Sequence, residues 1–352
     1  MVRKWLRGWL VITGLTLVVP QLVTAQVSAE QNASVLFFPK VIADGTWDTV
    51  IQLANSSSAQ VSARCFYVGR AQDAAACEQM AFTLWLTQNQ PTHWVVSTGR
   101  PVDTTDSGCK PSVLDCNGAG LDPGDVPPAP RAFRGELLCV EVDSSGAPVS
   151  DNHLSGIATL KDLTSGAVAK YNAVGAAGSP ANNGDGVLCL GGTASPTCPT
   201  GGEFSACPQT WMFSHLADGA EDPVIGPGST VTTNVTIVPC AQNLDTKVPA
   251  SVTAEFLITN EFEETLSAST TVTCWADLAL AAINAVFQPG LLGSDYAHTR
   301  ISPGSGSGGF IVVAEQFRSA GADGAKASAI LNLHVEGARA ESDVIVLPAA
   351  TQ

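Results

Sequence analysis

Hydrophobic and polar residues alternate with a period of two in many short stretches of this chain. In residues 61–67, Val61, Ala63, Cys65 and Tyr67 share one side, while Ser62 and Arg64 share the other. The same alternation recurs in residues 82–86, 138–142, 252–258 and 329–335. Such a pattern is typical of antiparallel strands that pack one face on a core and turn the other to solvent. We therefore predict an all-β fold.

Turn-rich segments divide these strands into two groups. We predict two disulfide-braced, immunoglobulin-like β-sandwich domains, at residues 26–178 and 208–352, joined by a Gly-, Pro- and Cys-rich linker at 179–207. The first domain carries a long, proline-rich loop at residues 99–131. Residues 277–287 are rich in alanine and end before Pro289, so we expect a short helix there.

A short motif appears once in each half. Ala43-Asp44-Gly45, then Asp48, then Val50-Ile51, matches Ala217-Asp218-Gly219, Asp222 and Val224-Ile225 in the same spacing. The next cysteine follows 14 residues later in the first half and 15 later in the second. The match suggests a duplication, but a chain this rich in small residues also allows chance similarity.

The N-terminus has the pattern of a secretion signal. Arg3, Lys4 and Arg7 precede an apolar run at residues 9–19 that is too short to span a bilayer. We expect cleavage after Ala25, with a second possible cut after Ala29, which makes residues 1–25 a signal peptide. The protein is then exported to the periplasm, the outer surface or the extracellular space.

Charge narrows the range of partners. Without the three basic residues of the leader, 14 Lys and Arg remain against 32 Asp and Glu, a net charge of −18. An acidic surface repels phosphate backbones and anionic lipid, so we expect no nucleic-acid partner. We also expect no transmembrane segment after cleavage, because no second apolar run approaches spanning length.

Ten cysteines in an exported chain indicate disulfides. None has the spacing of a zinc, haem or redox motif. If the halves are duplicated, we expect two sheet-linking bridges, Cys65–Cys139 and Cys240–Cys274. The close pair Cys109 and Cys116 is expected to staple the long loop.

Catalytic motifs are not evident. The segment Gly304-Ser305-Gly306-Ser307-Gly308 places glycine where a nucleophile elbow needs serine, and the five histidines occur singly. His215 and Asp218 are close enough in sequence to meet, most simply in a turn-stabilising hydrogen bond. We therefore predict a non-enzymatic protein with no catalytic residue and no cofactor, and we keep a secreted hydrolase as the less favoured alternative.

Two weaker possibilities concern ligands. The Asn- and Asp-rich segments 182–186 and 218–222 contain the oxygen donors of a structural Ca²⁺ site, without the spacing of a helix-loop-helix motif. Trp47 lies beside a turn and Trp85 lies on a threonine-bearing strand face. Both are candidate contacts for a glycan or a peptide.

Several stretches look familiar together: Leu36-Phe37-Phe38-Pro39-Lys40, Asp44-Gly45, Gln90-Pro91-Thr92-His93-Trp94, Gly135-Glu136-Leu137-Leu138-Cys139-Val140-Glu141, Asn152-His153-Leu154-Ser155-Gly156, Leu188-Cys189-Leu190-Gly191-Gly192 and Val272-Thr273-Cys274-Trp275. They resemble an uncharacterised group of exported bacterial β-rich proteins. The resemblance implies a bacterial envelope or extracellular setting and brings no activity with it. We predict a structural or interaction protein with a protein or glycan partner at the cell surface, the alternative being a glycan- or peptide-binding module.

Overall fold

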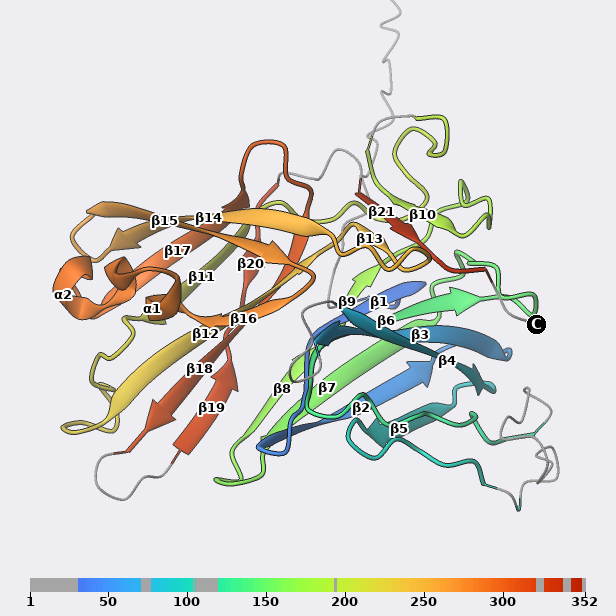
Figure 1. Cartoon of the computed structure of the whole chain (residues 1–352), viewed down its shortest axis with the longest axis horizontal. Helices are drawn as coiled ribbons and strands as arrows, with labels where there is room; N and C mark the ends of the chain where they lie inside the picture. The colour runs from blue at the N-terminus through green and yellow to red at the C-terminus, as the bar shows by residue number, and fades with distance from the viewer. Residues whose placement is uncertain are drawn as a thin grey trace, which may run out of the picture.

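The computed structural model describes residues 31–70, 77–103, 105, 120–192, 195–320, 326–337 and 343–349. Strands dominate these residues, so the prediction of an all-β chain is confirmed (Figure 1). The predicted signal peptide and the pair Cys109 and Cys116 lie outside the described residues. No described helix has the length and apolar character needed to cross a membrane.

The described residues of the first half form ten strands, of which β1 to β7 are separated mainly by short turns. Their bounds are β1 Val35–Ala43, β2 Trp47–Asn55, β3 Val61–Arg70, β4 Glu78–Leu86, β5 Pro91–Val95, β6 Phe133–Val142, β7 Leu154–Asp162, β8 Val168–Asn172, β9 Val174–Ala176 and β10 Val187–Leu190. β10 and a disulfide lie inside the stretch we predicted to be a linker.

The second half contains the remaining strands and three short helical turns. These are β11 Trp211–Leu216, β12 Thr230–Pro239, β13 Gln242–Asn243, β14 Ser251–Asn260, β15 Thr265–Thr273, β16 Ala276–Ala279, α1 Leu280–Ile283, η1 Ala285–Phe287, α2 Pro289–Leu292, β17 Tyr296–Pro303, β18 Phe310–Ser319, β19 Lys326–Ile330, β20 His334–Val335 and β21 Asp343–Val346. The helix predicted at 277–287 is thus a strand end followed by two separate turns.

The strands form five sheets. In strand order, sheet A is β4-β3-β6-β1-β9, sheet B is β5-β2-β7-β8, sheet C is β10-β21-β13, sheet D is β15-β14-β17-β11-β20 and sheet E is β16-β12-β18-β19. The arrangement is a propeller-like ring, so the prediction of two immunoglobulin-like sandwiches is wrong. An immunoglobulin sandwich keeps its first two strands in one sheet, whereas β1 and β2 lie in different sheets here.

The two halves repeat the same strand order. Replacing β1 to β9 by β11, β12 and β14 to β20, in sequence, converts sheet A into sheet D and sheet B into sheet E. The last strands of the two halves, β10 and β21, pair with each other in sheet C, and the extra strand β13 runs parallel to β21. The chain therefore contains two topologically equivalent units, which supports the suggested duplication.

The repeated Ala-Asp-Gly motif occupies equivalent corners of the two units. It follows β1 in the first half and β11 in the second, and both Gly45 and Gly219 have φ of +90°. At this φ a side chain would strain the backbone, so glycine is required at both corners. The cysteine offset was a coincidence, because Cys65 lies in β3 whereas Cys240 follows β12, the counterpart of β2.

Alternation correctly predicts the buried face of β14, where Val252, Ala254, Phe256 and Ile258 are buried. It fails for residues 329–335, which do not form one strand. β19 ends at Ile330 in sheet E, and β20 begins at His334 in sheet D. The counterparts β8 and β9 make the same change of sheet. The polar and apolar pattern continues across this crossing, so it did not reveal the break.

Two hydrophobic clusters form the core. One lies between sheets A and B and includes Phe38, Leu53 and Trp94. The other joins the opposite face of sheet A, through residues such as Phe37 and Leu138, to sheets C, D and E. Sheet A is therefore covered on both faces, and the two halves share one of their cores.

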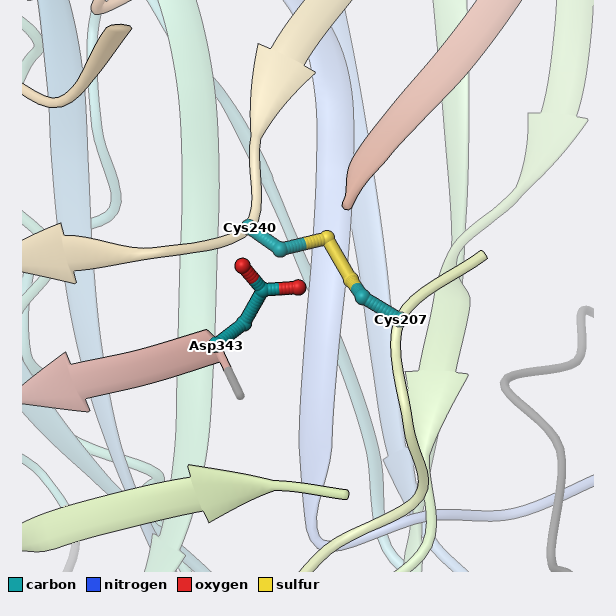
Figure 2. Close-up of side chains that lie close together, drawn as sticks. All are labelled: Cys207, Cys240 and Asp343. Carbon is teal, nitrogen blue, oxygen red and sulfur yellow. A yellow bond between two sulfur atoms is a disulfide. The ribbon is translucent and has the colours of Figure 1, made fainter. Parts of the chain in front are cut away.

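Four disulfides are formed among the described residues, and one of our two proposed pairings is confirmed. Cys65 bonds to Cys139, its direct partner on the neighbouring strand, so the bridge lies within sheet A and does not link two sheets. The pairing Cys240–Cys274 is wrong. Cys240 bonds to Cys207 beside the buried Asp343 (Figure 2), and Cys274 has another partner. The fourth bridge is Cys189–Cys198.

The bridge Cys77–Cys274 links the halves covalently across 197 residues of sequence. Cys77 lies just before β4 and Cys274 just after β15, and these two strands are counterparts in the duplicated order. Sequence spacing could not reveal this pairing, because it depends on how the two units are docked.

A buried ion cluster also joins the halves. The Nζ of Lys40 on β1 lies 2.9 Å from Asp277 Oδ1 on β16 and 2.9 Å from Glu315 Oε2 on β18. All three side chains are at most 5% exposed. Burial disfavours the ammonium, but the two carboxylates outweigh it and raise the pKa of Lys40. Tyr171 anchors the same residue, since its hydroxyl accepts from the Lys40 N–H and donates to its carbonyl.

Candidate functional site

Trp47, predicted to be open to a ligand, is partly buried between the halves. Its ring packs edge-on against Phe317 of β18, with 5.8 Å between ring centroids. Asp44 closes the turn before it, accepting hydrogen bonds from the backbone N–H groups of Thr46 and Trp47. Trp47 thus contributes to docking of the two units.

Trp85, the second candidate, lies at the edge of a surface groove with a volume of about 440 Å³. We call this the Trp85 groove; it is lined by Ser62, Arg64, Ala81, Phe82, Thr83, Trp85, Val142, Asp143, Ser144, Ser145 and Gly146. The backbone N–H of Trp85 donates to Pro123 O at 2.8 Å, so the end of the long loop fixes this strand edge. The indole is partly exposed.

Fixed polar groups face the Trp85 groove. The guanidinium of Arg64 lies 5.2 Å from the Phe66 ring centroid and donates to Pro348 O at 2.7 Å. Asp143 accepts hydrogen bonds from the hydroxyl and the backbone N–H of Ser145. These bonds lower the pKa of the Asp143 carboxyl, and the bond from the hydroxyl has the larger effect. An aromatic face beside prearranged donors and acceptors suits a polar, uncharged ligand such as a saccharide.

A smaller pocket of about 270 Å³ adjoins this groove and shares four lining residues with it, Ser62, Val142, Asp143 and Ser144. It is lined by Glu141, Asp151 and His153, whose potential ligand atoms lie within 4.8 Å of one another. Glu141 is buried, and both of its carboxylate oxygens have hydrogen-bond partners.

One oxygen of Glu141 lies 2.9 Å from Nδ1 of His153, and the other accepts from the N–H of His153 and the hydroxyl of Ser34. These bonds hold the chain between β6 and β7. Glu141 and His153 stand in two of the stretches quoted for the resemblance, but nothing in the sequence pairs them. They are twelve residues apart and meet because β6 and β7 lie in facing sheets.

Sheet B carries a further groove of about 560 Å³ that sequence reasoning missed. The strand register places His93, Gln52, Ile157 and Asn172 in one row across β5, β2, β7 and β8. Adjacent strands are about 4.8 Å apart, so this row is roughly 14 Å long. Two of the stretches quoted for the family resemblance, around His93 and around Gly156, meet at this groove.

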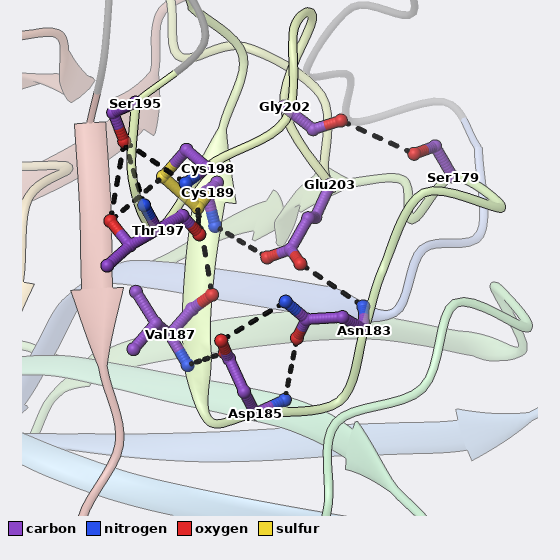
Figure 3. The surroundings of a disulfide bond; sticks show 10 residues. All are labelled: Ser179, Asn183, Asp185, Val187, Cys189, Ser195, Thr197, Cys198, Gly202 and Glu203. Atoms are coloured by element: carbon purple, nitrogen blue, oxygen red, sulfur yellow. Dashed lines mark hydrogen bonds between the residues drawn. A yellow bond between two sulfur atoms is a disulfide. The ribbon is translucent and has the colours of Figure 1, made fainter.

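Predicted calcium donors are already engaged with the protein. In the segment 182–186, Asp185 accepts from Val187 N–H at 2.8 Å and from the Asn183 amide at 3.1 Å. The buried Glu203 accepts from the N–H groups of Asn183 and Cys189, beside the Cys189–Cys198 bridge (Figure 3). These bonds order the loop between β9 and β10.

The carboxylates of the second calcium candidate, residues 218–222, are also engaged with protein donors. Asp218 accepts from the backbone N–H groups of Thr233 and Ala281, and Asp222 forms an ion pair with Arg318 at 2.9 Å. A Ca²⁺ ion at either segment would have to compete with these protein donors. Calcium remains a prediction from sequence alone.

His215 and Asp218 do not bond to each other as predicted. The Nδ1–H of His215 donates to Leu216 O at 2.9 Å, and its Nε2 accepts from the Thr299 hydroxyl at 2.8 Å. Burial lowers the pKa of His215 to about 4. The imidazole is therefore a neutral, hydrogen-bonded core residue.

Comparison with known proteins assigns no family. No protein-family model matches the chain, and no curated protein matches it. One solved structure that aligns with it is the cryo-EM atomic structure of broad bean stain virus. The identity is 8% over 95% of this chain and 96% of that chain, with a TM-score of 0.14. This score supports no argument about fold or function.

Proposed function

We propose that the protein is an exported, non-enzymatic interaction protein of the bacterial cell envelope or extracellular space, which presents its surfaces on a rigid scaffold. The observation that carries this proposal is the double tie between the two repeated units. Cys77–Cys274 joins them covalently, and Lys40 joins them through two buried carboxylates. Domains in one chain otherwise move relative to each other unless a large or specific interface holds them.

Four disulfides support the exported setting, because such bonds persist in oxidising compartments and are rare in the cytosol. Determining the N-terminus and cellular fraction of the native protein tests this part. We expect a chain that begins after Ala25 or Ala29 in an extracytoplasmic fraction. An intact Met1 on a cytosolic protein with reduced thiols would refute it.

The favoured activity is binding through a surface groove. The Trp85 groove combines an aromatic side chain with fixed charged and hydroxyl groups, which favours a glycan or a short peptide. The groove on sheet B, where the polar side chains of His93, Gln52 and Asn172 share a row with Ile157, is the second surface available to such a partner.

A glycan array followed by titration of the best ligand tests this function. If the Trp85 groove binds it, Trp85→Ala should weaken binding roughly tenfold, because a stacked aromatic contributes about 0.5–1.5 kcal/mol beyond the area it buries and about 1.4 kcal/mol is a factor of ten. Trp47→Ala serves as the matched control, since that ring packs internally on Phe317. Saturable binding that both variants leave unchanged points away from the Trp85 groove.

A hydrolase remains the alternative to a binding protein. Activity-based probes for serine, cysteine and glycoside hydrolases, applied to the native protein, separate the two. Specific, saturable labelling of one residue would contradict the proposal, and the label would identify the nucleophile.

A further inference from the structure

Sheet D ends in a long strand with an open edge. β15, Thr265–Thr273, pairs only with β14, through nine consecutive residue pairs without a bulge. It contains no charged residue and no proline. An edge of this kind exposes unpaired backbone donors and acceptors, and natural proteins usually block such edges.

The other sheet edges in the described chain are short, covered or blocked. The long edge strand β4 begins with Glu78, and its Trp85 N–H already bonds to Pro123 O. The edge strand β5 begins with Pro91, which has no N–H to donate. The edge strands β8 and β19 lie against each other, so each is covered. The edge strands β9, β10, β13, β16 and β20 have four residues or fewer. Among these edges, β15 alone is long and uncharged. The turns α1 and η1 come close to it, but no backbone hydrogen bond in the described chain joins them to it.

The sequence of β15 is suited to pairing with itself. Its exposed face carries only hydroxyl residues, namely Thr265, Ser267, Ser269, Thr271 and Thr273, while Leu266, Ala268, Thr270 and Val272 alternate with them. On the exposed face the hydroxyl positions coincide when read in either direction from Ser269. On the other face Ala268 takes the place of Thr270, and Leu266 takes the place of Val272. A two-fold axis through Ser269 would therefore place hydroxyl beside hydroxyl along the whole strand, as an isologous interface requires.

Sheet D already uses this hydroxyl pairing internally. The side-chain oxygens of Ser251 and Thr273 are 2.7 Å apart, and those of Thr253 and Thr271 are 3.0 Å apart, between β14 and β15. Cross-strand Thr and Ser pairs of this kind stabilise sheets. A second copy of β15 would extend the same ladder by one strand.

Charge selects the antiparallel orientation. Glu261, Glu263 and Glu264 lie in the turn that precedes β15. Antiparallel pairing places the two acidic turns at opposite ends of the strand, roughly 27 Å apart and beyond the screening length of about 8 Å at physiological salt. Parallel pairing would bring the two turns together.

We propose that the protein forms a two-fold symmetric dimer in which β15 of one copy pairs antiparallel with β15 of a second copy, with Ser269 on the axis, making one continuous ten-stranded sheet from two copies of sheet D. The partner is a second copy because the strand is complementary to its own reverse. The interface extends beyond the binding function proposed above and does not depend on it.

Charge-swap variants at Ser269 test this interface. Sedimentation velocity of the native protein from about 10 µM to 1 mM should show a monomer–dimer equilibrium, because one strand pair is at the small, weak end of protein interfaces. Ser269→Lys and Ser269→Glu should each raise the dimer Kd at least tenfold, since like charges would meet on the axis. An equimolar mixture of the two variants should restore dimerisation.

Ser214→Lys is the matched control, because Ser214 lies on β11 of the same sheet, three strands from the β15 edge, and should leave Kd unchanged. Far-UV circular dichroism and melting curves confirm that all variants fold. The proposal is overturned if the native protein stays monomeric throughout this range. It is also overturned if either charged variant dimerises as the native protein does, or if mixing the two variants restores nothing.

Discussion

Replacing Lys40 by methionine should destabilise the protein strongly and in a pH-dependent way. The substitution keeps an unbranched apolar chain but removes the ammonium that lies 2.9 Å from both Asp277 and Glu315. Two buried carboxylates then face each other without a cation. Breaking a buried ion pair on one side costs about 3–5 kcal/mol.

The structure allows a closer figure. Asp277 keeps the hydroxyl of Thr236 as a donor at 2.8 Å, and the variant can relieve the remaining repulsion by binding one proton at the pair of carboxyls. Protonating a carboxyl with an ordinary pKa of about 4.3 costs roughly 3.7 kcal/mol at pH 7 and about 1 kcal/mol at pH 5. We therefore expect Lys40→Met to lower the free energy of unfolding by about 4 kcal/mol at pH 7, and by much less at pH 5.

Urea unfolding with intact disulfides, followed by tryptophan fluorescence, measures this loss. Trp275 is a suitable reporter, because its indole N–H donates to Pro39 O next to the cluster. The double variant Lys40→Met, Glu315→Gln is the control and should recover at least half of the loss. A loss below about 1 kcal/mol at pH 7, or one that is equal at pH 5 and pH 7, would refute the conclusion that the Lys40 ammonium stabilises the fold by neutralising the two buried carboxylates.

Further predictions concern other buried groups. Burial raises the pKa of Glu136 to about 8, so its ionisation costs stability as pH rises from 4.5 to 8. Glu136→Gln should therefore raise the free energy of unfolding by up to about 5 kcal/mol at pH 9 and have little effect at pH 4; equal effects in urea titrations at both values would contradict this. The pKa of His215 is lowered to about 4, so its neutral form contributes stability that is full above pH 6.5 and lost as pH falls toward 4. In an NMR titration its ring signals should stay unchanged from pH 8 to pH 5, and a midpoint near 6.5 would show that the ring is solvated. Cys77→Ser with Cys274→Ser should cost about 2–4 kcal/mol in urea unfolding and open the junction of the halves to limited proteolysis. The pair Cys189 and Cys198, which closes only a short loop, serves as the control, and an undiminished resistance to protease in the first variant would contradict a covalent tie.

Local sequence patterns determined several of the strands and the two Asp-Gly corners of the fold. Alternation along β4 and β14 identified the buried faces, because a strand with one wet side must change polarity at every residue. In β3 the alternation held only as far as Cys65, since sheet A is covered on both faces. The Asp-Gly corners were predictable for a similar reason, since a backbone with positive φ selects glycine whatever surrounds it. These features depend on residues that are neighbours in sequence.

Tertiary contacts decided which strands share a sheet. The break between β19 and β20 and the placing of β1 and β2 in different sheets depend on which strand lies alongside, and every strand edge offers the same backbone groups. The pairing of Cys77 with Cys274 likewise follows from the docking of two whole units. The spacing of residues along the sequence does not indicate these strand and cysteine pairings.

The sequence by itself thus determined that this protein is β-rich, disulfide-bonded and acidic, because composition and short-range alternation act within each segment. Only the tertiary structure decided that Lys40 lies against Asp277 and Glu315, that Trp47 is packed while Trp85 lines a groove, and that β15 is left without a neighbour. The physical reason is that burial, ion pairing and an open edge are properties of surfaces brought together from distant parts of the chain, and they have no counterpart in any local run of residues.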